Sequence, residues 1–286
     1  MQTGCGRAAP GLPWGLDAVP PSPASAPVVQ APEDSVNAAA RRAILLFTRA
    51  PEAEARAKGL PVEAGSRLFE AFLGGWRERA AQTGADLLVV APSESVRTLR
   101  RLFPDACVAA QQGPSFGARV EAAFSFAFAR GAGAVLMAGC DSPPLEAPEV
   151  EAAFAHLDSS AGAMALAPAE DGGVNAIGLN AAADRRIAHI RWLGADVDRQ
   201  LRAFARRDGL ALWLSSSSPD LDRVRDLAGL YRLSRFAARW RVFRALLRRL
   251  LAGVGEFLSG DRRAPAGVAL DSPITRGPPR ALSLSL

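Results

Sequence analysis

The sequence predicts an α/β protein with a mixed, mostly parallel sheet and helices on both faces of that sheet. Short apolar runs alternate with longer segments whose apolar residues recur every three or four positions, a pattern typical of βαβ units. A Gly-Gly turn joins two later apolar runs closely enough for an antiparallel hairpin, which makes the sheet mixed. No glycine-rich dinucleotide or Walker fingerprint follows the first run, so neither of those phosphate sites is expected.

Each element follows from its local pattern. The first strand is the apolar run at 43–48, and a clear helix is 66–83, where Leu68, Phe72 and Trp76 share one face. The remaining apolar runs predict strands at 86–91, 107–111, 134–138, 163–167, 174–179 and 210–214. The remaining periodic segments predict helices at 93–103, 116–130, about 145–157, 196–207 and 220–230.

The two ends of the chain differ from its middle. Residues 1–40 and 258–286 are rich in proline and have no hydrophobic period, so both are expected to be disordered. The folded domain is then expected to span 41–232. Residues 233–257 follow it as a basic amphipathic helix.

That C-terminal helix has two interpretations. Between Ser234 and Phe257 the apolar residues recur every three or four positions, and most arginines lie away from them. The helix either docks on the domain or at a dimer contact, or it lies on an anionic membrane near a lipid-linked acceptor. Docking is the more frequent arrangement. The sequence does not determine the oligomeric state.

Charge and cysteine content restrict the partners and the compartment. The chain has 286 residues, a net charge of +5, and Lys58 as the only lysine among its 34 basic residues. Much of the positive charge lies in the C-terminal helix and tail rather than among aromatic residues of a domain, so no nucleic-acid partner is expected. Cys5, Cys107 and Cys140 have neither metal-ligand nor disulfide spacing. With no signal peptide pattern, the expected location is cytoplasmic, with membrane-peripheral contact as the alternative.

Asp141 is the leading candidate for a functional residue. The apolar run Ala134–Ala138 is followed by Gly139, Cys140 and Asp141, which places this acid at the carboxyl end of a buried strand. The alternative is that Asp141 caps the helix expected from about residue 145. Cys140 is interpreted as a small core residue, because no histidine stands in a position to activate it.

Charged residues near the ends of other strands predict a diphosphate site. Asp171 follows the fifth strand, and the loop after the first strand contains Arg49, Arg56 and Lys58. Mg²⁺ or Mn²⁺ takes one or two carboxylates together with phosphate oxygens, and basic side chains neutralise the remaining phosphate charge. The alternatives are an ordinary hairpin turn at Asp171 and a solvated surface for the basic loop.

Three segments together resemble the bacterial DUF2064 family. They are ILLFTRAP, GARVEAAFSFAFARGAGAVLMAGCDSPPL and APAEDGGVNAIGL, and the resemblance covers about residues 43–230. Proteins of this family are described as glycosyltransferases with the GT-A nucleotide-diphospho-sugar transferase fold, and some are linked to arsenosugar biosynthesis. They are distantly similar to molybdenum-cofactor and phospholactate nucleotidyltransferases. The resemblance implies a three-layer GT-A-like domain.

The resemblance also implies roles for single residues. Asp141 matches the metal-binding acid of the strand-four motif, and Asp171 would lie beside the donor sugar or acceptor, as a positioning group or base. Gly172 and Gly173 would leave room for the ligand. Gly113 and Arg119 match a family segment near the nucleotide.

The resulting hypothesis is a metal-dependent transferase that uses a nucleotide sugar, with a small-molecule or lipid-linked acceptor. Arg49, Arg56 and Lys58 would bind its phosphates. One alternative is a nucleotidyltransferase that uses a nucleoside triphosphate, and another is a non-catalytic binding protein. The first loop departs from the family pattern, because Lys58 and Arg56 are displaced by a residue or two.

Overall fold

The computed structural model describes residues 41–183 and 186–260. The predicted disordered segment 1–40 lies outside the described residues. The same holds for the predicted tail, except for residues 258–260, which belong to the last helix.

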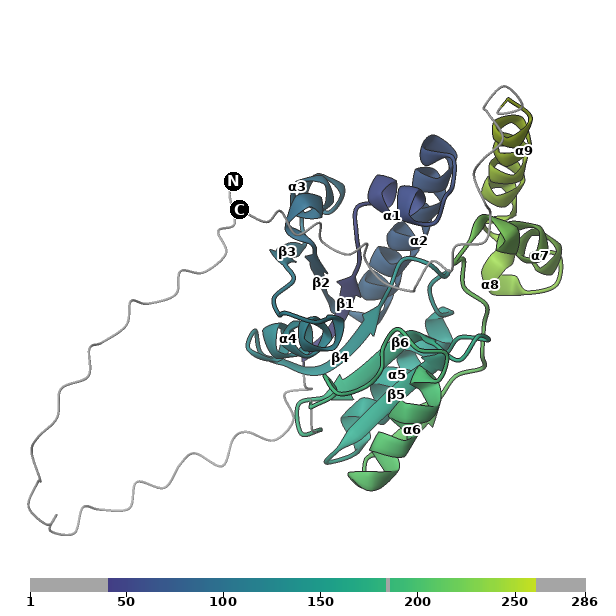
Figure 1. Ribbon diagram of the computed structural model, residues 1–286. Coiled ribbons are helices and arrows are strands. Elements are labelled where there is room, and N and C mark those ends of the chain that lie inside the picture. Colours follow the sequence, from purple (N-terminus) through teal and green to yellow (C-terminus); the bar gives the residue numbers. More distant parts are fainter. Residues whose placement is uncertain (1–40, 184–185, 261–286) are drawn as a thin grey trace, which may run out of the picture. The chain divides into compact units, whose positions relative to one another are not determined.

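One mixed sheet of seven strands forms the centre of the described part of the chain (Figure 1). Its strand order is β3-β2-β1-β4-β6-β5-β7. Among the strands of this described sheet only β6 is antiparallel to its neighbours, β4 and β5, and it forms the predicted hairpin with β5. The strands are β1 Arg41–Phe47, β2 Asp86–Ala91, β3 Cys107–Ala110, β4 Ala132–Ala138, β5 Ala163–Pro168, β6 Val174–Asn180 and β7 Ala211–Leu214.

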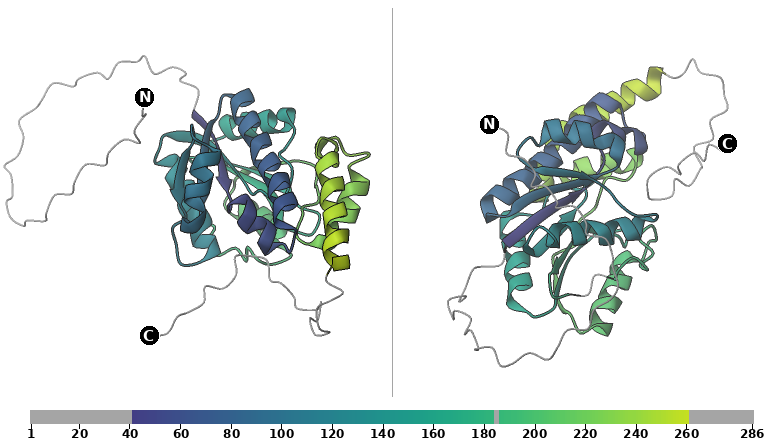
Figure 2. Two further views of the ribbon diagram at one scale, coloured as in Figure 1. Left: turned by 90° about the horizontal axis from the view of Figure 1, so that it is seen from above. Right: turned by 90° about the vertical axis from the view of Figure 1, so that its left-hand side faces the viewer.

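Helices cover both faces of this sheet, so the predicted α/β class is confirmed (Figures 1 and 2). One face packs against α2, α3 and α5, and the other packs against α4 and α6. The bounds of these helices are α2 Val62–Thr83, α3 Ser93–Leu102, α4 Phe116–Phe128, α5 Ala147–Ser159 and α6 Val197–Arg207.

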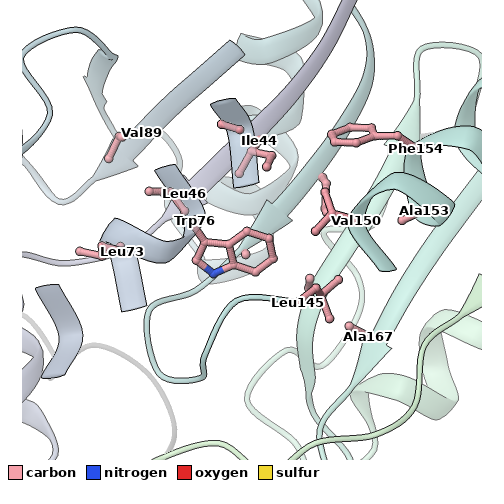
Figure 3. Packing of buried hydrophobic residues seen from close by; sticks show 14 of the residues in the cluster. Ile44, Leu46, Leu73, Trp76, Val89, Leu145, Val150, Ala153, Phe154 and Ala167 are labelled. Atoms are coloured by element: carbon pink, nitrogen blue, oxygen red, sulfur yellow. The ribbon is translucent and has the colours of Figure 1, made fainter. Parts of the chain in front are cut away.

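The two core layers follow from the alternation of side chains along each strand. On β1, Ile44 and Leu46 face the α2 side, whereas Leu45 packs on the α4 side. Trp76 of α2 lies among these side chains with 1% of its surface exposed (Figure 3). Phe154 of α5 completes the same layer. Since both faces of β1 are buried from Ala43 to Leu46, that part of its sequence is continuously apolar rather than alternating.

The strand order changes direction at β1, and this positions the site. From β1 the chain builds outward to β2 and β3 on one side, and β4 lies on the other. In open α/β sheets ligands bind outside the carboxyl ends of the strands at such a switch point. The residues that follow β1 and β4 therefore face a natural crevice.

One local prediction and one of the alternatives were wrong. The segment after β1, expected as a loop, forms helix α1 (Pro51–Ala57), because Pro51 stands in its first turn and Glu52 and Glu54 are acids in that turn. Asp141 does not cap α5. The N-cap is Glu146, which forms a reciprocal capping box with Glu149.

The C-terminal region forms several short helices rather than one. A 3₁₀ turn at Val224–Asp226 leads into α7 (Leu227–Leu233), so the helix predicted from residue 220 begins later. After a break at residues 234–237, the chain continues as α8 (Ala238–Arg241) and α9 (Arg244–Gly260).

The apolar side of these C-terminal helices packs against α2 and α7, as the docking interpretation predicts. The buried side chains on it are Trp240, Phe243, Leu247, Leu250 and Val254. Phe72 of α2 meets the rings of Trp240 and Phe243 edge-on, at centroid distances of 5.7 and 4.7 Å. In the described part of the chain, no helix combines the length and the apolar character that a membrane span requires.

Candidate functional site

A cavity of about 260 Å³ opens at the carboxyl edge of the sheet. Three strands deliver residues to it: β1 and β4 by their carboxyl ends, and β6 by its amino end, because β6 runs in the opposite direction. Helix α1 and the segment 220–223 close its sides. Its polar lining includes Thr48, Arg49, Glu54, Lys58, Gln111, Asp141, Asn175, Asp220, Asp222 and Arg223.

Three aspartates meet in this cavity. One carboxylate oxygen from each of Asp141, Asp220 and Asp222 lies within 4.8 Å of the other two. Leu221 holds them together, because its N–H donates to the carbonyl oxygen of Asp141 at 2.8 Å. The side chain of Leu221 is fully buried in the core with α2 and α7, so the acids on either side of it stay at the cavity.

Lys58 lies at the centre of the acidic residues. Its Nζ is 3.0 Å from Oδ1 of Asp222, 3.2 Å from Oδ2 of Asp141 and 3.6 Å from Oε1 of Glu54. Glu54 is one helical turn earlier on α1, and its other oxygen, Oε2, forms an ion pair with Nε of Arg49 at 2.8 Å. The side chain of Lys58 is 8% exposed. Lys58, which follows α1, is therefore the buried counter-ion of three acids and not an exposed residue of a loop.

Opposing effects set the protonation of this pair. Burial lowers the pKa of Lys58, but the charges of Asp141, Glu54 and Asp222 outweigh that effect, and the net pKa is raised. Burial likewise raises the pKa of Asp141, whereas Lys58 and, more weakly, Arg49 bring it below its ordinary value. Both groups are charged at neutral pH.

Asp220 behaves differently. Burial, together with the charges of Asp141 and Asp222, raises its pKa from 3.8 to about 7. The cluster thus holds more negative charge than Lys58 balances. Carboxylate oxygens in excess of their counter-charge are the donor set that Mg²⁺ and Mn²⁺ prefer, so these residues fit a hard divalent cation.

Two buried polar atoms in the cavity lining have no partner among the described residues. They are Nη1 of Arg49 and Oδ1 of Asn175. The amide nitrogen of Asn175 donates to the carbonyl oxygen of Ser218 at 2.8 Å, which ties the segment before Asp220 to β6. A buried donor without an acceptor is costly. The free nitrogen of Arg49 is suited to an anionic ligand atom.

An aromatic wall faces these polar groups. Phe47 and Phe116 contact each other edge-on with their ring centroids 5.5 Å apart, and Trp192 lies 6.1 Å from Phe116. All three line the cavity, and Leu193 extends the wall with 47% of its surface exposed. The cavity therefore has a charged side and an apolar side.

Four of the predicted site residues lie at the cavity. Arg49, Lys58, Asp141 and Gly173 all line it, although they come from segments up to 124 residues apart (from 49 to 173). Cys140 is buried beside Asp141, and burial raises the pKa of its thiol, which agrees with its interpretation as a core residue.

The other five predicted residues do not line the cavity. Asp171 is exposed, and its Oδ1 accepts from the N–H of Gly173 at 2.9 Å, so the carboxylate closes the hairpin turn. Gly172 has a φ of +90°, and a Cβ there would come within 2.0 Å of the carbonyl oxygen of Ala195. A glycine is needed at this position because the backbone of Ala195 occupies the space of a side chain.

Arg56, Gly113 and Arg119 also lie away from the cavity. Arg56 points from the exposed side of α1, and Nε of Arg119 donates to the carbonyl oxygen of Ser115 at the start of α4. Gly113 has a φ of +128° in the exposed turn before α4.

Sequence reasoning missed Glu54, Asp220 and Asp222. The two aspartates occur about 80 residues after Asp141, in a segment expected to begin a helix. The signal was the pattern Asp-Leu-Asp, in which one apolar residue between two acids indicates an extended segment anchored by its middle side chain. Glu54 is recognisable only once α1 is known to be helical, because it then faces Lys58 at i,i+4.

Comparison with known proteins finds a family model that matches part of this chain. The model of DUF2064, "Uncharacterized protein conserved in bacteria", matches residues 77–193. The matched part contains Asp141 but neither Lys58 nor Asp222. No curated protein is similar enough to count as a match.

A solved structure shares the fold, and other solved structures are similar at lower scores. A provisionally assigned nucleotide-diphospho-sugar transferase from Desulfovibrio desulfuricans G20 is 27% identical, with a TM-score of 0.62 over 73% of this chain and 97% of that one. Rv0371c from Mycobacterium tuberculosis H37Rv is 14% identical, with a TM-score of 0.47 over 67% and 97%. The mannosyltransferase PcManGT from Pyrobaculum calidifontis, in complex with GDP-Man and Mn²⁺, is 11% identical, with a TM-score of 0.46 over 79% and 76%.

Proposed function

We propose that this protein is a transferase that depends on a divalent cation and uses a nucleotide-diphosphate donor, and that the donor is a nucleotide sugar. The observation that carries the proposal is the meeting of Asp141, Asp220 and Asp222 within 4.8 Å at the switch point of the sheet. Diphosphates bind proteins through such carboxylate-held cations together with basic side chains.

The three aspartates would hold Mg²⁺ or Mn²⁺. When bound, the cation supplies positive charge that neutralises the diphosphate and stabilises it as a leaving group. Lys58 keeps Asp141 ionised and fixes one carboxylate oxygen each of Asp141 and Asp222. Its ammonium is occupied by acids in this structure, so we assign it to positioning the carboxylates rather than to direct phosphate contact.

Arg49 is the proposed phosphate ligand. Its Nε forms an ion pair with Glu54 at 2.8 Å, and its buried Nη1 has no hydrogen-bond partner among the described residues. A phosphate oxygen would satisfy that donor by a charge-assisted hydrogen bond.

The donor class is supported by two features. The aromatic wall of Phe47, Phe116 and Trp192 offers flat apolar surface for a nucleobase or sugar ring opposite the charged side. The similar structure from Desulfovibrio desulfuricans G20 is provisionally assigned to nucleotide-diphospho-sugar transfer.

Calorimetric titration of the purified full chain with Mn²⁺, followed by UDP-, GDP-, dTDP- and CDP-sugars, tests the proposal. Asp222→Asn should reduce Mn²⁺ affinity at least about tenfold, since one carboxylate of the cluster is lost. Asp86→Asn is the matched control, because this 52% exposed aspartate starts β2 at the opposite edge of the sheet. A donor affinity that is the same with and without Mn²⁺ would contradict the proposal.

The nucleotidyltransferase alternative is separated by the ligand and the product. It predicts Mn²⁺-dependent binding of a nucleoside triphosphate in preference to any nucleotide sugar, and pyrophosphate release on turnover. A non-catalytic binding protein would bind a donor without consuming it. Hydrolysis of the donor in the presence of Mn²⁺, measured as release of nucleoside diphosphate, distinguishes these cases.

A further inference from the structure

A basic surface with exposed apolar side chains covers the outer side of α8 and α9. We call it the arginine face. It consists of Arg235, Phe236, Arg241, Val242, Arg248 and Arg249, all of which are exposed. It lies on the side of these helices opposite to the buried Trp240, Leu247 and Leu250.

The spacing of the residues puts them on one side of the helices. Arg241, Ala245, Arg248 and Ala252 follow at intervals of four, three and four, and all are exposed. The buried residues Phe243, Leu247 and Leu250 lie between them in sequence. Phe236 joins this side from the turn before α8, since Nη2 of Arg241 donates to its carbonyl oxygen at 3.5 Å.

The charge of this region has one sign. Residues 227–255 contain seven arginines and no aspartate or glutamate. Two of the seven serve the fold: Arg239 pairs with Glu149 of α5 at 2.6 Å, and Arg244 lies over the ring of Tyr231 at 4.2 Å. The arginines of the face are left to solvent, where they create a positive potential.

The apolar members of the face have no role in the core. Phe236 is 79% exposed and Val242 is 76% exposed, and they are two of the four large hydrophobic side chains that are exposed among the described residues. Beneath them, Trp240 and Phe243 pack against Phe72 of α2. Their exposure is therefore a property of the folded surface.

We propose that the arginine face binds an anionic lipid surface, with its arginines at the phosphate headgroups and Phe236 and Val242 inserted between them. Apolar side chains flanked by arginines gain from the acyl boundary of a bilayer. A nucleic acid would offer the same phosphates but no apolar environment for Val242, so the lipid is favoured. The inference is independent of the proposed catalytic function.

Sedimentation of the full chain with vesicles tests the proposal. Vesicles of equal parts phosphatidylcholine and phosphatidylglycerol should bind the protein, and vesicles of phosphatidylcholine alone should not. Arg241→Gln with Arg248→Gln should weaken binding about twenty-fivefold, at about fivefold for each charge. Phe236→Ser with Val242→Ser keeps the net charge and should still weaken binding about tenfold.

A matched control distinguishes binding by the arginine face from attraction by the net positive charge of the protein. Arg97→Gln with Arg101→Gln removes two exposed arginines from α3, with the same change in net charge. This variant should bind vesicles like the parent chain. Three results would overturn the proposal: equal losses for the α3 and α8–α9 variants, no effect of the Phe236 and Val242 changes, or binding to single-stranded DNA without binding to anionic vesicles. Thermal unfolding checks that each variant is folded.

Discussion

Replacing Lys58 by methionine should destabilise the metal-free protein strongly. Methionine keeps the length of the side chain but removes the ammonium that contacts Glu54, Asp141 and Asp222 at 3.0–3.6 Å. Breaking a buried ion pair by removing one partner costs about 3–5 kcal/mol, because the remaining charges lose their compensation.

The lower end of that range applies here. Asp141 and Asp222 keep 35% and 28% of their side-chain surface exposed, so water partly screens the carboxylates left behind. We therefore expect a loss of about 3 kcal/mol, which for a domain of this size lowers Tm by about 6–12 °C.

The loss should depend on pH through the acids. The pKa of Lys58 is raised, so its contribution is complete below its unfolded value of 10.5 and is lost only at more alkaline pH. The pKa of Asp141 is lowered, so its contribution is present above 3.8 and fades as the pH falls below that value. Parent and variant should thus differ fully at pH 7 and converge on acidification.

Urea unfolding followed by circular dichroism measures the effect, first with EDTA and then with Mn²⁺. Mn²⁺ should restore part of the lost stability, because it replaces the missing positive charge. Arg67→Met is the control: its ion pair with Glu63 is 57% and 83% exposed, and its loss should cost less than about 1 kcal/mol. Equal stability of parent and Lys58→Met at pH 7 in EDTA would refute the role of Lys58 as counter-ion.

Three other outcomes follow from the structure. With EDTA, the unfolding free energy should fall as the pH rises toward 7. The reason is that the folded protein still holds the proton of Asp220 (pKa about 7) at a pH where the unfolded chain has lost it. Urea titrations at a series of pH values should show that Asp220→Asn removes this pH dependence. Gly172→Ala should lower the unfolding free energy by more than about 2 kcal/mol, whereas Gly84→Ala, also at positive φ but with open space around it, should cost about 1 kcal/mol. Trp240→Ala should cost about 3–5 kcal/mol, measured by the same unfolding assay, and a loss below about 1 kcal/mol would contradict docking of α8.

Periodicity and strand order account for what the sequence could predict. The apolar run of β4 predicted a buried strand, and the switch-point rule then placed Asp141 at the ligand edge. Asp171 shows the limit of that argument. The rule locates strand ends but says nothing about where a side chain points, and a backbone N–H two residues later captured the carboxylate.

The missed acids show a second limit. Asp220 and Asp222 reach the cavity because Leu221 is buried beneath α7 and α9, and the positions of those helices depend on packing with α2. The pattern Asp-Leu-Asp at 220–222 indicates an extended segment with a buried middle side chain, but it does not say which part of the fold that segment contacts. A site built from segments that meet only through the tertiary fold can be recognised in sequence by its residue types, but not by its full set of members.

The geometry around Lys58 explains why this chain, which otherwise uses only arginine, has a lysine here. The three acids come from three segments, namely α1, the end of β4 and the segment 220–223, and they surround a single atom. An ammonium has three donors on one tetrahedral centre and can serve three such oxygens, whereas a guanidinium spreads its donors in one plane. Arg49, which fills the planar role, pairs with Glu54 through Nε and leaves Nη1 to the cavity. The two basic side chains thus have different roles: Lys58 holds the carboxylates in place, and Arg49 keeps a donor that can bind a ligand.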